Sequence, residues 1–130
     1  MNTFKTIGRP LPERLNVVYT CKTEILDDPK VLYTQDDPLT LFRKLKGMGY
    51  NEICAVGGSF LNTSLMHIGL IDEIHLTIIP KLFGSGLSMF SQGLNLDRNL
   101  ELKFAQLMDD KQTVLLIYKV IYGEKNALRN

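Results

Sequence analysis

A glycine pair between a predicted strand and a predicted helix constrains this fold more than any other feature. The short apolar run I-C-A-V at residues 53–56 predicts a buried strand, and Gly57 and Gly58 follow it directly. Residues 59–68 then show helical spacing, and residues 74–79 predict another strand that ends at Pro80. This order is typical of α/β proteins, in which the N–H groups at a helix N-terminus can bind phosphate. The segment therefore predicts a nucleotide-cofactor site.

The rest of the chain supplies further strands and one more helix. Residues 15–20 and 31–33 are short apolar runs that predict strands, and Pro38 marks a helix start after two possible capping aspartates. The predicted buried face of that helix carries Leu39, Phe42, Leu45 and Met48. Residues 100–108 and 113–122 predict two strands joined by a tight turn. We therefore expect a mixed α/β fold: a mostly parallel sheet flanked by helices, with an antiparallel hairpin at its C-terminal end.

Length and composition describe an ordinary globular protein. The chain has 130 residues, of which 45% are hydrophobic and 22% charged, and its net charge is +1. We expect residues 1–123 to form a single domain and residues 124–130 a polar tail. The balanced charge argues against nucleic acid or a membrane surface as a partner, and the start of the chain lacks a signal peptide, so we expect a cytoplasmic protein. Two cysteines without metal-ligand spacing predict no metal site.

The glycine pair is the first candidate binding site. The backbone N–H groups of Gly58, Ser59, Phe60 and Leu61 could hold a diphosphate beyond the carboxyl end of the preceding strand. The full G-x-G-x-x-G pattern is absent, which disfavours a standard dinucleotide-binding half. The alternative is that the glycines only turn the chain.

A second candidate follows the strand at residues 15–20. Thr20, Cys21 and Lys22 place a hydroxyl and an ammonium at its carboxyl end, where both could bond the 2′-phosphate of NADP. The alternative is an ordinary solvated strand end.

Arg14 lies on a loop stiffened by Pro10 and Pro12. Its guanidinium is suited to grip a carboxylate or phosphate with two hydrogen bonds. The alternative is a surface arginine with no ligand.

Two stretches of the chain resemble the RibD C-terminal family, the riboflavin-pathway reductases of the dihydrofolate-reductase-like fold. The first is N-T-F-K-T-I-G-R-P-L-P-E-R-L-N-V-V-Y-T, and the second is V-G-G-S-F-L with G-L-I-D-E-I-H-L-T-I-I-P-K-L-F-G-S-G-L-S-M-F. The resemblance extends to about Gly123. It implies the cofactor NADPH, hydride transfer to a ring or sugar carbon of a pyrimidine or pterin substrate, and a homodimer.

The resemblance also implies roles for individual residues. Arg14 matches a substrate-binding arginine, and no catalytic residue is assigned. The implied cofactor-binding residues are Thr3, Thr20, Cys21, Lys22, Gly57, Gly58, Ser59, Phe60 and Leu61.

The chain departs from the family pattern in two places. The family has a first strand, a substrate loop and an acidic residue ahead of the segment equivalent to residues 2–4, so we expect this chain to be N-terminally truncated and to lack the first strand. Riboflavin-pathway members usually carry Glu before the glycine pair, where this chain has Val56. Three interpretations therefore stay open: a riboflavin-type reductase, a pterin reductase of the dihydrofolate-reductase type, and a non-catalytic remnant of either.

Overall fold

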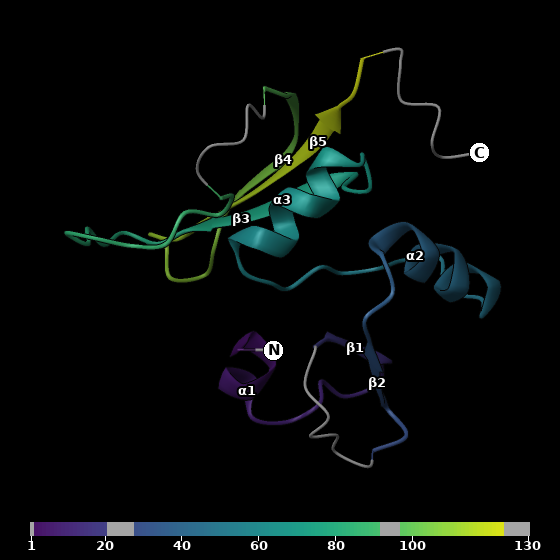
Figure 1. Cartoon of the computed structure of the whole chain (residues 1–130). Helices are drawn as coiled ribbons and strands as arrows, with labels where there is room; N and C mark the ends of the chain where they lie inside the picture. Colours follow the sequence, from purple (N-terminus) through teal and green to yellow (C-terminus); the bar gives the residue numbers. More distant parts are fainter. Residues whose placement is uncertain (1, 21–27, 92–96, 124–130) are drawn as a thin grey trace. The chain divides into compact units, whose positions relative to one another are not determined.

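The structure is a computed structural model that describes residues 2–20, 28–91 and 97–123. It divides into two compact units, Met1–Gly57 and Gly58–Asn130. The elements in chain order are α1 (Asn2–Ile7), β1 (Asn16–Tyr19), β2 (Val31–Thr34), α2 (Pro38–Gly47), α3 (Ser59–His67), β3 (Glu73–Ile78), β4 (Asn99–Leu107) and β5 (Val114–Ile121) (Figure 1). The single domain over residues 1–123 stays a prediction, and the predicted tail lies outside the described residues.

The first unit contains a two-stranded parallel sheet. β1 and β2 pair from Asn16 opposite Val31 to Tyr19 opposite Thr34. Both strands are rich in β-branched and aromatic residues, which favour the extended backbone. Because the strands are parallel, their carboxyl ends, at Tyr19 and Thr34, lie at the same edge.

Helix α2 begins as its sequence predicts. Asp37 is the N-cap, and Pro38 occupies the first helical position, where its missing N–H costs nothing. Gly49 follows the helix with a φ of +91°, a left-handed conformation that favours glycine. The buried side chains are Leu41 and Leu45, four residues apart. Of the predicted face only Leu45 is fully buried, and Met48 at its end is exposed because the helix stops at Gly47.

The second unit is a helix on a three-stranded antiparallel sheet of order β3-β5-β4 (Figure 1). Its core includes Met66 of α3 and Val120 of β5. The hydroxyl of Tyr122 joins the two layers, since it donates to the Ile71 carbonyl at 2.8 Å and lies 3.5 Å from the Met66 sulfur. Helix α3 therefore covers the sheet face that carries Val120.

The turn between β4 and β5 is organised by Asp110. Its carboxylate accepts from the backbone N–H groups of Gln112 at 3.0 Å and Thr113 at 2.8 Å, and also from the Thr113 hydroxyl. These bonds to the ionised form lower the pKa of Asp110. Lys111 takes the left-handed conformation, with φ of +57°. The predicted hairpin is therefore confirmed.

The predicted mixed α/β class is confirmed, and two details differ from the sequence prediction. Parallel pairing among the described strands is limited to β1 and β2. The predicted strand at residues 53–56 is wrong for this structure, because the segment has no regular secondary structure, with Ile53 46% and Val56 54% exposed. No described strand pairs with it, and an apolar run without a hydrogen-bonding neighbour cannot form a sheet.

Helix α1 is an element that the sequence prediction missed. It has six residues and no acidic residue in its first turn, so it lacks a recognisable start signal. Gly8, with φ of +76°, follows it and donates to the Phe4 carbonyl at 3.1 Å. The rings of Phe4 and Tyr33 on β2 make a T-shaped contact, with centroids 6.5 Å apart. This aromatic contact holds α1 against the parallel sheet.

Candidate functional site

The N-terminus of α3 lacks a side-chain cap. Its N-cap is Gly58, in an extended conformation with φ −73° and ψ 172°, and no side chain accepts a hydrogen bond from the first turn. The N–H groups at the start of a helix have no partner within the helix, and the macrodipole makes this end positive. Ser59, Phe60 and Leu61 therefore present backbone donors in the geometry that binds an anion.

The N-cap position itself is uncrowded. A Cβ built on Gly58 would meet no atom within 4 Å, and the Phe60 side chain is 81% exposed. The Ser64 hydroxyl donates to the Phe60 carbonyl at 3.0 Å, which leaves the Phe60 N–H unaffected. These residues fit a diphosphate, because its oxygens accept hydrogen bonds from clustered N–H groups.

The loop after β3 is attached to the next turn of α3. The Asn62 side-chain amide donates to the Met89 carbonyl at 2.9 Å, and the Thr63 hydroxyl accepts from the Ser91 N–H at 2.8 Å. Thr63 is almost completely buried. The polar side chains of this turn therefore hold the loop, while the first turn of the helix keeps its donors.

In the first unit, Thr20 lies directly after β1 and is buried. Its N–H donates to the Thr34 carbonyl at 3.2 Å, so the two threonines lie side by side at the carboxyl ends of β1 and β2. Thr34, which the sequence prediction missed, is also buried, and its hydroxyl accepts from the Asp36 N–H at 3.0 Å. Parallel strands end at one edge, so the signal that could have found Thr34 was the placement of its strand beside that of Thr20.

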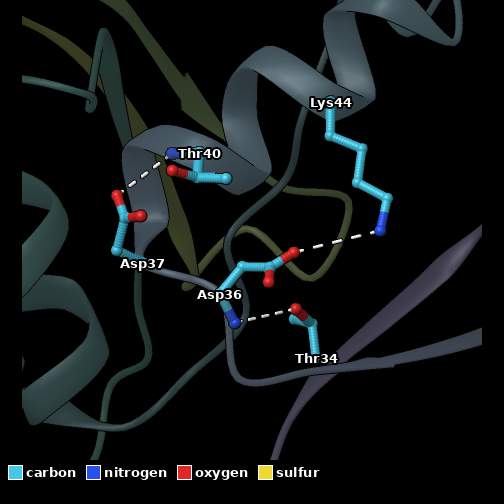
Figure 2. Close-up of polar contacts among 5 residues, drawn as sticks. All are labelled: Thr34, Asp36, Asp37, Thr40 and Lys44. Atoms are coloured by element: carbon cyan, nitrogen blue, oxygen red, sulfur yellow. Dashed lines mark hydrogen bonds and ion pairs between the residues drawn. The ribbon is translucent and has the colours of Figure 1, made fainter.

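Two acidic side chains, Asp36 and Asp37, lie between the end of β2 and the start of α2 (Figure 2). Asp37 accepts from the N–H groups of Leu39 and Thr40 at 3.1 Å each, and the Lys44 ammonium lies 3.9 Å from the Asp36 carboxylate. Burial, followed by the negative charges of Asp37 and Asp36, raises the pKa of the Tyr19 phenol. The edge of the parallel sheet is therefore locally negative.

The other predicted residues of the first unit are distributed over separate elements. Thr3 lies on α1, and Gly57 is the last residue of the unit. Arg14 is exposed on the loop before β1, where its Nε donates to the Pro12 carbonyl at 3.0 Å. Cys21 and Lys22 lie outside the described residues. The structure thus brings Gly58, Ser59, Phe60 and Leu61 together at the start of one helix. Thr20 belongs to a different element, the edge formed by the carboxyl ends of β1 and β2.

Comparison with known proteins decides the family. The sequence matches the RibD C-terminal domain over residues 10–116. The chain belongs to the RibD C-terminal domain family. Among curated proteins, the uncharacterized protein YyaP of Bacillus subtilis (strain 168) is 33% identical over 89 residues, which are 68% of this chain and 47% of YyaP. The chain therefore spans about half the length of that relative.

Solved structures agree on the fold. A putative riboflavin biosynthesis protein from Shewanella sp. PV-4 matches with a TM-score of 0.78 and 19% identity, over 93% of this chain and 69% of that one. RibD of Acinetobacter baumannii matches with a TM-score of 0.59 and 23% identity, over 71% of this chain and 27% of that one. A pyrimidine reductase-like protein from Corynebacterium diphtheriae matches with a TM-score of 0.58 and 23% identity, over 71% of this chain and 38% of that one.

The dihydrofolate-reductase-like fold class is thereby confirmed. Among the residues that the structure describes, no helix is long and apolar enough to cross a membrane.

Proposed function

We propose that this chain binds NADPH and acts as a reductase of the RibD C-terminal type. The reaction would be hydride transfer as in the reduction of 5-amino-6-(5-phosphoribosylamino)uracil in riboflavin biosynthesis. The observation that carries the proposal is the uncapped start of α3 after a glycine pair, with no atom crowding the N-cap glycine. That end offers the donors and the positive potential that a cofactor diphosphate needs.

Each residue has a defined part in this proposal. Gly57, Gly58, Ser59, Phe60 and Leu61 would hold the diphosphate through backbone N–H groups. Thr3, Thr20, Cys21 and Lys22 would contact the rest of the cofactor, as the family resemblance implies. Arg14 would bind the substrate, because a guanidinium on an exposed loop can pair with a phosphate or carboxylate.

Bound NADPH supplies a hydride from its nicotinamide ring. The chain's own contribution is to fix the cofactor at the diphosphate and to orient the substrate, which makes the transfer effectively unimolecular. A pterin of the dihydrofolate type is the alternative substrate, since Val56 stands where riboflavin-type members usually carry Glu.

A cofactor-binding protein without turnover is the second candidate function. The observation that favours it is the irregular, exposed segment at residues 53–56, which leads directly into the glycine pair. In such a protein the diphosphate site is present, but the backbone before it is not held by a sheet.

Fluorescence titration of the chain with NADPH, and separately with NADH, tests the proposal. We expect saturable binding with NADPH as the preferred ligand, and a Gly58→Asp variant that binds neither. No change in fluorescence with either cofactor at millimolar concentration would reject cofactor binding altogether. Substrate-dependent loss of reduced nicotinamide absorbance then separates the candidates: oxidation with a pyrimidine or a pterin identifies a reductase, whereas binding without oxidation identifies the second candidate.

A further inference from the structure

The carboxyl ends of β1 and β2 carry a charged side chain beside their two buried threonines. The Thr20 N–H donates to the Thr34 carbonyl at 3.2 Å, so hydrogen bonding continues past the last residue of β1. Asp36 comes two residues after β2 and is held at this edge, because its N–H donates to the Thr34 hydroxyl at 3.0 Å (Figure 2). In open α/β sheets, ligands bind beyond the carboxyl ends of the strands. Asp36 therefore lies on the side of the parallel sheet where a ligand is expected.

The carboxylate of Asp36 is engaged differently from that of its neighbour Asp37. Asp37 accepts from two backbone N–H groups at the start of α2. Asp36 instead pairs with Lys44, whose ammonium lies 3.9 Å from its carboxylate, and the two side chains are 41% and 50% exposed. Both members of this ion pair are open to solvent, so each can contact a bound molecule.

The charge of Asp36 is felt at the end of β1. Burial raises the pKa of the Tyr19 phenol, and the negative charges of Asp37 and Asp36 raise it further. Tyr19 is the last residue of β1, and Thr20 follows it directly. The negative potential of the turn after β2 therefore extends over both strand ends, where Lys44 is the cation that opposes it.

NADPH and NADH differ at one position, the 2′ carbon of the adenosine ribose, which carries a phosphate in the first and a hydroxyl in the second. A carboxylate at a strand end accepts a hydrogen bond from the hydroxyl, whereas it repels the phosphate. A cationic side chain does the opposite, because it bonds phosphate oxygens. Thr20, at this same edge, is a cofactor contact that the family resemblance implies. The pair of Asp36 and Lys44 thus combines both preferences beside an expected cofactor contact.

We propose that Asp36 and Lys44 set the discrimination between NADPH and NADH. Asp36 accepts from a ribose 2′-hydroxyl and opposes a 2′-phosphate. Lys44 neutralises Asp36 and offers its ammonium to the phosphate, so it favours NADPH. Because the two charges act against each other, the preference for NADPH is small, about tenfold or less. This inference rests on the proposed cofactor binding and adds two specificity-determining residues to it.

The ratio of the dissociation constants of NADH and NADPH tests the inference, measured by fluorescence titration at one ionic strength. Asp36→Asn removes the charge and keeps the backbone N–H that bonds Thr34, and we expect it to raise the ratio about tenfold in favour of NADPH. Lys44→Met leaves the carboxylate unopposed, and we expect it to lower the ratio about tenfold. Opposite shifts are specific to charge, because a loss of structure weakens the binding of both cofactors.

An ion pair on β4 supplies the matched controls. The Lys103 ammonium lies 3.1 Å from the Glu101 carboxylate, both side chains are about as exposed as those of Asp36 and Lys44, and neither belongs to the parallel sheet. Glu101→Gln and Lys103→Met make the same changes of charge. We expect the ratio to stay within about twofold of wild type, because solvent and salt screen charges that do not contact the cofactor. Circular dichroism checks that each variant is folded, and Lys44→Met decides if Asp36→Asn is not.

The outcomes separate this inference from the proposed function. A wild type that binds both cofactors, with the ratio unmoved in Asp36→Asn and Lys44→Met, would overturn the inference and leave the proposed function standing. Equal shifts in the β4 controls would overturn it too, because net charge would then be the cause. So would a wild type that binds NADPH and not NADH. A wild type that binds neither cofactor would overturn the inference together with the proposed function.

Discussion

Helices α2 and α3 begin in opposite ways, and the difference locates the candidate site. α2 starts with Asp37, whose carboxylate accepts from two backbone N–H groups. α3 starts with Gly58, which has no side chain to do so. At the start of α2, the backbone donors that Asp37 binds are therefore satisfied by a negatively charged group. The start of α3 keeps its backbone donors and its positive potential.

The comparison teaches that a missing cap leaves backbone donors available to a ligand. Most helix starts gain stability from a capping side chain, so a glycine at this position sacrifices stability and gives access. Of these two helix starts, that of α3 suits an anionic ligand. An aspartate at the start of α2 occupies the donors and repels phosphate.

The largest expected effect comes from giving α3 the cap of α2. Gly58→Asp introduces no clash, because a Cβ there meets no atom within 4 Å. Two like charges about 4 Å apart near a protein surface repel by about 4 kcal/mol, so we expect NADPH affinity to fall by more than about a hundredfold. Fluorescence titration measures it, and Gly58→Asn is the control that adds a cap without charge. If Gly58→Asp binds NADPH with unchanged affinity, the uncapped start of α3 is not the diphosphate site.

The reverse change removes the cap of α2. Asp37→Ala leaves two first-turn donors without their partner, and we expect the melting temperature to fall by roughly 4 °C, the shift that loss of a typical cap gives in a domain of this size. Thermal unfolding followed by circular dichroism measures the shift. Gly58→Ala, at the helix start that has no side-chain cap to lose, is the matched control and should shift the transition less.

Low pH provides a second test of the Asp37 cap of α2. Hydrogen bonds from Thr40 and Leu39 lower the pKa of Asp37 below its ordinary value of 3.8. A depressed folded-state pKa gives stability that is fully present above about pH 3.8 and is lost as the pH falls through the folded value. We expect the stability difference between wild type and Asp37→Ala to shrink below pH 3.8 in urea unfolding. A difference that stays constant down to pH 2 would show that the ionised carboxylate is not the cap.

The smallest expected effect concerns the stability of α3 itself. Gly58→Asn supplies a neutral cap and should raise the free energy of unfolding by a few tenths of a kcal/mol. Chemical denaturation with urea measures it. A clear loss of stability would mean that the glycine is needed for the backbone conformation, which its φ of −73° does not suggest.

Local signals predicted most of the fold. The cap at Asp37, Pro38 at the helix start, the glycine before α3 and the turn at Asp110 each act within a few residues, and each appears in the structure as predicted. Non-local requirements account for the errors. Residues 53–56 have the composition of a buried strand, but a strand also needs a neighbour, which no local pattern supplies.

The candidate site also divides into a part that local sequence signals predict and a part that depends on how strands pair. The donors of α3 follow from the glycine pair, whereas Thr34 and the negative edge around Tyr19 depend on β1 and β2 lying side by side. The short helix α1 was missed because it has no start signal and is held by the contact between Phe4 and Tyr33.

Amide chemical shifts during an NADPH titration test the central claim most directly. The account predicts large shifts for the backbone N–H groups of Ser59, Phe60 and Leu61, and none for Leu39 and Thr40, whose donors Asp37 already holds. Saturable shifts confined to other residues, with the start of α3 unmoved, would contradict it.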